Sequence, residues 1–75
     1  MITLIVHRYH SPVVFPHDSF EEAAEDAVSQ MDLGQSYPEK IVDGEGNVLW
    51  EHDGPFGKKL RELREISEAR KGGGA

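Results

Sequence analysis

Residues 40–51 read KIVDGEGNVLWE, in which two runs of strand-forming residues flank a short segment that contains two glycines. This pattern predicts a β-hairpin, because glycine can take the left-handed conformation that a tight loop requires. With Gly46 at that position of a three-residue loop, the pairing of the two strands is fixed. The pairing assigns side chains to two faces of a sheet: Ile41 and Leu49 to the first, and Val42, Val48 and Trp50 to the second.

A further strand is predicted for residues 2–9, which read ITLIVHRY and are rich in β-branched side chains. Side-chain alternation assigns Leu4 and Val6 to the first face of the sheet, and Ile5 and Tyr9 to the second. Both faces are then apolar, so we expect both of them to be covered.

Residues 10–17 contain Pro12 and Pro16 and read as a loop, because proline cannot donate a hydrogen bond to a sheet. Within this segment, residues 13–15 form either a brief extra strand or a flap on the core, and both alternatives stay open. The sheet is therefore expected to have three strands.

The first helix is predicted to begin at a capping box, in which Ser19 caps the amide of Glu22 and Glu22 reaches back. Asp18 and Glu21 offer the same pattern one residue earlier. Gly34 is suited to end the helix in the left-handed conformation. An apolar stripe at helical spacing faces the sheet and comprises Phe20, Ala23, Ala24, Ala27, Val28 and Met31.

A second, basic helix is predicted after the break at residues 53–55, with Leu60, Leu63 and Ile66 along one side. The whole chain is then an α+β domain with a three-stranded sheet in β-α-β-β order, one packed helix and a C-terminal basic amphipathic helix. We expect an acidic domain at 1–54, the basic helix at 55–71 and a disordered tail at 72–75.

The net charge of −6 conceals two opposite parts. Residues 1–57 hold two basic and eleven acidic side chains, whereas residues 58–75 hold six basic and three acidic ones. The acidic face of the first helix comprises Asp18, Glu21, Glu22, Glu25 and Asp26. The basic helix carries Lys58, Lys59, Arg61, Arg64 and Arg70. Charge runs of this kind are usually solvated surfaces.

The sequence favours no catalytic or metal chemistry. It has no cysteine, which excludes disulfides and thiolate sites and favours an intracellular setting. Its four histidines, at positions 7, 10, 17 and 52, do not have the spacing of a metal site, and no phosphate loop or nucleophile elbow is present. We therefore expect a protein without cofactor or metal that is not an enzyme, and no segment is apolar for long enough to span a membrane.

The order of these motifs resembles a known group of proteins. The opening strand, the segment SFEEAA at 19–24 and the segment YPEKIVDGEGNVLW at 37–50 are similar to small uncharacterised proteins of actinobacteria and their bacteriophages. The resemblance covers residues 1–53 and omits the basic helix. It implies a phage or prophage accessory protein, and it carries over no catalytic residue.

These observations predict a non-catalytic module in the bacterial or phage-infected cytoplasm that binds and modulates a host protein or associates with itself. The predicted contact residues are Tyr9, Val42, Val48, Trp50, Leu60, Leu63 and Ile66. Two alternatives stay open: the acidic face imitates DNA and occupies a DNA-binding protein, or the basic helix binds nucleic acid weakly. Nucleic acid ranks below protein as the expected partner, because the body of the chain is acidic.

Overall fold

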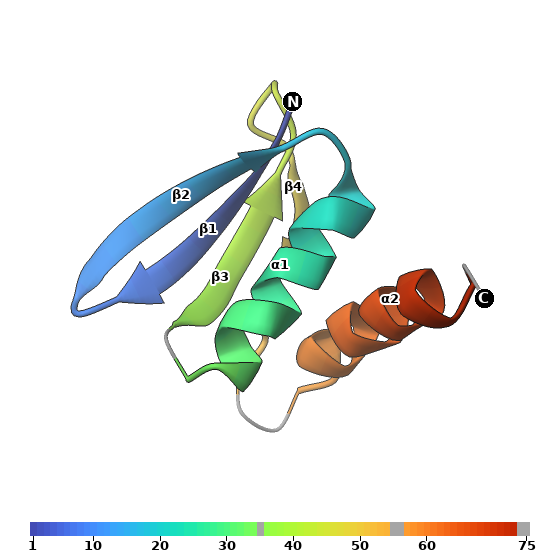
Figure 1. Cartoon of the computed structure of the whole chain (residues 1–75). Coiled ribbons are helices and arrows are strands. Elements are labelled where there is room, and N and C mark those ends of the chain that lie inside the picture. Colours follow the sequence, from blue (N-terminus) through green and yellow to red (C-terminus); the bar gives the residue numbers. More distant parts are fainter. Residues whose placement is uncertain (35, 55–56, 74–75) are drawn as a thin grey trace.

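The computed structural model describes residues 1–34, 36–54 and 57–73, and of residues 71–73 it describes the backbone alone. The elements are β1 (Ile2–Arg8), β2 (Ser11–His17), α1 (Phe20–Asp32), β3 (Tyr37–Val42), β4 (Val48–Glu51) and α2 (Lys59–Gly73). The strands form one antiparallel sheet in the order β2-β1-β3-β4. Both helices lie on the same side of the sheet, with α2 beside α1 (Figure 1). The predicted α+β class is confirmed.

The predicted number of strands is wrong by one, because residues 11–17 pair with β1. Of the two alternatives left open for residues 13–15, the structure has the extra strand, and it is longer than expected. Only Tyr9 and His10 connect the two strands, and their φ angles are 49° and 70°. Two consecutive positive φ angles are typical of a type I′ turn, which suits twisted strands but is usually built from Asn and Gly. The sequence contains no such dipeptide here, so it carries no turn signal between the two strands.

Pro12 and Pro16 fit within β2 because of their place in the ladder. The pair of Arg8 and Ser11 closes the two-residue turn, and pairs along an antiparallel ladder alternate between bonded and non-bonded. Both prolines fall at non-bonded pairs, so their nitrogen atoms face the open edge of the sheet, where no ladder hydrogen bond is lost.

Helix α1 begins and ends where the sequence predicts. Ser19 Oγ accepts a hydrogen bond of 3.2 Å from the N–H of Glu22, and Glu22 Oε2 accepts one of 3.3 Å from the N–H of Asp18. After the C-cap, Gly34 has a φ of 72° and its N–H donates to the carbonyl of Met31. The predicted stripe is buried at Ala23, Ala24, Ala27 and Val28 and half-buried at Phe20 and Met31.

The β3–β4 hairpin departs from the predicted register at one residue. Val42 is opposite Val48, as predicted, but Ile41 is opposite Trp50. Leu49 is therefore the extra residue of a β-bulge, and a bulge changes the face on which the next side chain lies. Trp50 consequently lies on the helix side of the sheet and is 3% exposed, so its predicted place beside Val42 and Val48 is wrong.

Helix α2 covers Trp50 and completes the core. The indole Nε1 donates a hydrogen bond of 3.0 Å to the carbonyl oxygen of Lys59, at the start of α2. The buried core consists of Leu4, Val6, Ala23, Ala24, Ala27, Val28, Ile41, Trp50 and Leu63. The predicted boundary at 54–55 adjoins residues outside the described part, and the predicted tail at 72–75 begins inside α2. Within the described residues, neither helix has the length and apolar character to cross a bilayer.

The β1–β2 turn gives a first prediction. Replacing Tyr9 and His10 by Asn and Gly removes side chains that disfavour the left-handed conformation, so the free energy of unfolding should rise by about 1–2 kcal/mol. Urea denaturation followed by the fluorescence of the single tryptophan measures the change. Tyr37→Asn serves as the control, because it replaces an exposed tyrosine outside the turn. An equal gain in the control would contradict the assignment of the effect to the turn.

The core gives a second prediction. Leu63→Ala should lower the free energy of unfolding by about 2–5 kcal/mol, because it opens a cavity in the buried core to which α2 contributes this side chain. The neighbouring Glu62→Ala is the control, since that side chain is exposed. Thermal unfolding by circular dichroism separates the two variants. A Leu63→Ala variant as stable as the native chain would show that α2 does not contribute to the core.

Candidate binding surface

The face of the sheet opposite the helices is here called the outer face. Its members follow from the alternation of side chains along each strand and from the pairing of neighbouring strands. They are Thr3, Ile5 and His7 of β1, Pro12, Val14 and Pro16 of β2, Tyr37, Lys40 and Val42 of β3, and Val48 and Glu51 of β4. Both helices pack on the other face, around the core, so the outer face is left to solvent (Figure 1).

Apolar side chains dominate the outer face and several are strongly exposed. Val14 is 59% exposed, Val48 is 51% exposed and Tyr37 is 65% exposed. Ile5 and Val42 lie between them and are half-buried by these neighbours. An apolar area that extends over four strands is typical of a contact surface rather than of a face that evolved to meet water alone.

The outer face carries almost none of the charge of the chain. Its charged members are Lys40 and Glu51, which lie opposite each other on β3 and β4. Their charges cancel, so this face is neutral at pH 7 while the chain as a whole has a net charge of −6. A surface of this kind favours contact with an apolar and uncharged surface.

Both open edges of the sheet are poor at adding a further strand. On β2, Pro12 and Pro16 remove two of the N–H groups that would face a new strand. On the other edge, β4 has four residues and contains the bulge at Leu49. Short, bulged and proline-containing edges resist strand addition, so contact through the outer face is favoured over contact through an edge.

The β1–β2 turn extends the outer face at one end. Tyr9 is 90% exposed at the tip of this turn. It lines a hollow of about 290 Å³ that lies between this turn and the end of α1, and the other lining residues are His7, Arg8, Met31, Gly34, Ser36 and Tyr37. Aromatic side chains held on a short turn and a strand are common anchors in protein contacts.

The structure separates the predicted contact residues into two groups. Val42 and Val48 lie on the outer face and Tyr9 lies beside it. By contrast, Trp50 and Leu63 are buried in the core, and Leu60 and Ile66 pack against it. The residues of the second group contact one another inside the core and are not available to a partner, because the bulge at β4 directs Trp50 toward α2.

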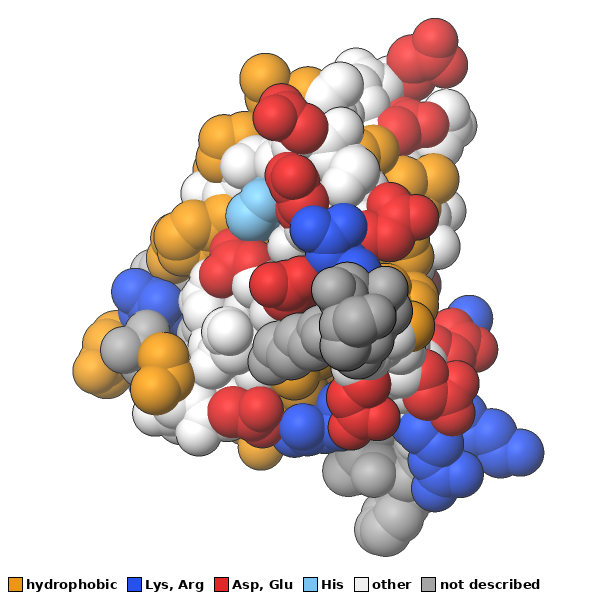
Figure 2. Space-filling model, turned by 45° about the vertical axis from the view of Figure 1, so that its right-hand side comes forward, with side chains coloured by type: hydrophobic (Ala, Val, Ile, Leu, Met, Phe, Trp, Pro, Cys, Tyr) orange, Lys and Arg blue, Asp and Glu red, His pale blue; other side chains and the backbone are white. Residues whose placement is uncertain are grey.

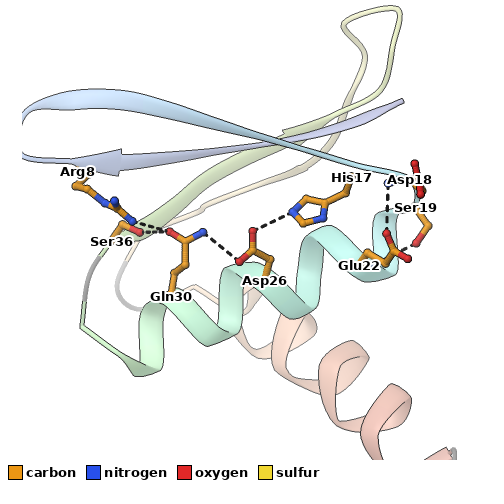
Figure 3. A network of polar contacts seen from close by, with 8 residues as sticks. All are labelled: Arg8, His17, Asp18, Ser19, Glu22, Asp26, Gln30 and Ser36. Carbon is orange, nitrogen blue, oxygen red and sulfur yellow. Dashed lines mark hydrogen bonds and ion pairs between the residues drawn. The ribbon is translucent and has the colours of Figure 1, made fainter.

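A polar network joins the helix side of the sheet to α1 (Figure 3). Gln30 is at its centre: its Oε1 accepts hydrogen bonds from Arg8 at 3.2 Å and from Ser36 at 2.6 Å. Its Nε2 donates to Asp26 Oδ1 at 3.2 Å, and Asp26 Oδ2 lies 2.9 Å from Nε2 of His17. Sequence analysis missed this network. The available signal was Gln30 itself, a polar residue beside the apolar stripe of α1.

His17 and Asp26 form an ionisable pair within the network. His17 and Asp26 line a hollow of about 360 Å³ with Ser29 and Arg70, but the hydrogen-bond partner that the described residues give His17 is Asp26. A catalytic triad would also require a nucleophile bonded to the ring. In the described part of the chain, no three His, Asp or Glu side chains are grouped so that they could hold a metal ion.

Many side chains of the acidic face and of the basic helix are engaged with each other or with the sheet. Arg70 Nε lies 2.7 Å from Glu25 Oε2, and Arg64 lies 2.8 Å from Asp32. Figure 2 shows basic side chains set among acidic ones over the helices. These ion pairs raise the pKa of both arginines, Arg64 mainly through its hydrogen bond to Asp32 and Arg70 mainly through its hydrogen bond to Glu25.

Internal pairing reduces the charge that either helix offers to nucleic acid or to a DNA-binding protein. Of the acidic face, Glu25 pairs with Arg70, and Asp26 is held by His17 and Gln30. Of the basic helix, Lys59 lies 3.7 Å from Glu62 on the next turn. Fewer unpaired charges mean fewer counterions to release on binding, and this release drives association with nucleic acid.

The β3–β4 loop is organised by Asp43. Its Oδ1 accepts hydrogen bonds of 2.9 Å from the N–H groups of Glu45 and Asn47, and its Oδ2 accepts one of 3.0 Å from the Asn47 side chain. The Asn47 side-chain bond is the largest cause of a pKa below the ordinary 3.8 for this carboxyl, and the backbone N–H groups add to it. Gly46 in the same loop has a φ of 87°, as predicted.

No family model, no curated protein and no solved structure matches this chain.

Asp43 gives a third prediction. Its pKa is lower when the chain is folded, so its carboxylate stabilises the fold above pH 3.8, and this contribution is lost as the pH falls through the folded pKa. The Asp43→Asn variant should therefore be less stable than the native chain at pH 7, and this difference should shrink on acidification. Urea denaturation at several pH values measures it, with Glu45→Gln as the control from the same loop. Parallel pH profiles for the native chain and Asp43→Asn would contradict the prediction.

Proposed function

We propose that this chain is a non-catalytic protein-binding module that docks through its outer face onto an apolar, uncharged surface of another protein. One observation carries the proposal: a four-stranded sheet has both helices on one face and exposes Val14, Tyr37 and Val48 on the other. Burying exposed apolar area releases roughly 25 cal/mol for each Å², so such a face gains free energy from a matching partner.

We propose a non-catalytic role because the most evident polar side chains are hydrogen-bonded to one another. His17, Asp26 and Gln30 are the most evident polar cluster, and they are bonded to one another and to Arg8 and Ser36 (Figure 3). The side-chain polar atoms of Gln30 and Asp26 are all bonded within this cluster, so it links a strand to a helix and supports the fold. Arg8 Nε, by contrast, is buried without a hydrogen-bond partner among the described residues. The residues most available for contact are on the outer face.

The resemblance of residues 1–53 to small proteins of actinobacteria and their phages supports a cellular setting for this module. We propose a phage or prophage accessory protein that acts in the bacterial or infected cytoplasm on a host protein. Imitation of DNA by the acidic face is the weaker alternative, because Glu25 and Asp26 are already paired within the chain.

Capture from a bacterial lysate tests the outer face and is the fourth prediction. The immobilised native chain should retain at least one protein that the Val48→Lys variant does not retain, because a lysine there places a charge in the apolar contact. Leu33→Lys is the matched control: Leu33 is 70% exposed at the end of α1, on the helix side.

The control variant should retain the same proteins as the native chain. Identical retention by all three chains would sink the proposed function. Circular dichroism spectra of the variants establish that each is folded before capture.

A further inference from the structure

The charge and the area of the outer face, together with the edges of the sheet, indicate which partner this face binds. We infer that two copies of this chain associate through their outer faces and form a two-layer sheet packing with the helices outside. The inference rests on the proposed function, because it assigns a partner to the same surface.

The distribution of charge favours association of two copies through their outer faces over association through their helices. Each chain has a net charge of −6 and the first turn of α1 carries Glu21 and Glu22, so two copies repel each other when they approach through their helices. The outer face is neutral, since Lys40 and Glu51 cancel. A two-fold contact needs a patch that complements itself, and a neutral apolar sheet meets this condition.

The partner that the outer face fits is itself uncharged. Recognition of a basic or acidic partner is usually marked by charges of the opposite sign around the contact. The eleven members of the outer face include one lysine and one glutamate, adjacent on neighbouring strands. A second outer face offers the same apolar valines at Val14 and Val48 and the same absence of net charge.

The edges of the sheet restrict how two copies can join. Pro12 and Pro16 on β2, and the short bulged β4, oppose a continuous sheet made by edge-to-edge pairing. Face-to-face packing remains, in which the side chains of two sheets interdigitate at a separation of about 10 Å.

The area of the outer face is small for an interface between two copies. Strands of up to seven residues with a rise of about 3.3 Å, in a four-stranded sheet with a strand spacing of about 4.8 Å, give about 400 Å² per copy. Two copies then bury about 800 Å², or somewhat more once side-chain relief is included, and this is below the size of stable complexes. An interface of this size is typical of weak and reversible association.

Salt distinguishes this contact from an ionic one. The contact is apolar and the remaining surfaces of the two copies repel, so screening should strengthen the dimer. Association through the acidic face and the basic helix would instead weaken as salt increases.

Sedimentation velocity of the purified full chain tests the inference. Between about 1 and about 300 μM the weight-average mass should rise from monomer toward dimer, and the dissociation constant should fall several-fold between about 50 and about 500 mM salt. Val14→Lys and Val14→Glu should both shift the chain to monomer, although one lowers and the other raises the net negative charge. Leu33→Glu should leave the dimer unchanged.

Each contrary result has a defined meaning. A monomer at every concentration overturns the inference, as does a dimer that withstands both Val14 variants or dissociates with added salt. If the purified chain stays monomeric while Val48→Lys still loses a protein from lysate, the second copy is the wrong partner and the proposed function stands. If the chain dimerises through Val14 and the lysate yields no other protein, the outer face binds a second copy. The proposal that it binds a host protein is then contradicted.

Discussion

The contact between Trp50 and the first turn of α2 determines how the rest of the molecule is arranged. The indole is buried on the helix side of the sheet, and its N–H is satisfied by the carbonyl of Lys59. A buried indole without a partner would be costly, so α2 must begin next to β4. With its start fixed there, Leu63 enters the same core, and α2 has no route to the opposite face.

The position of α2 therefore explains why the outer face is uncovered. Both helices contribute side chains to one core on the same side of the sheet. The alanines of α1 allow that helix to approach the sheet closely. Two ion pairs, Arg64 with Asp32 and Arg70 with Glu25, join α2 to α1 at the surface. Exposed ion pairs contribute only about 0–1 kcal/mol each, so Leu63 and Trp50 hold α2 in place and the charges refine its orientation.

Local signals in the sequence were sufficient for the parts of the fold that depend on one or two residues. The cap at Ser19, the helix end at Gly34 and the turn at Gly46 are each set by backbone geometry that few residue types can adopt. They are confirmed for this reason.

The predictions were wrong where the structure depends on a neighbouring strand or on one extra residue in a strand. Residues 11–17 form a strand because β1 lies beside them, and the prolines fit there only at alternate positions of the ladder. The bulge at Leu49 changes the face of Trp50, although β-propensity is the same in either register. The sequence has no pattern that indicates the extra residue of a bulge. For this reason some of the predicted contact residues lie on the outer face and others lie in the core.

The surviving part of that group makes a more specific surface than the full set would have done. Had Trp50 joined Val42 and Val48, the outer face would have carried the single tryptophan of the chain as well as Tyr37, and a small sheet could then have bound tightly. With Trp50 inside, the outer face covers about 400 Å², and its apolar part consists of valine, isoleucine, proline and tyrosine side chains beside Thr3, His7, Lys40 and Glu51. Such a face gains affinity from area and shape rather than from a single deep contact. A flat, neutral surface of limited area is therefore suited to reversible association, in which the acidic remainder of the chain keeps other approaches unfavourable.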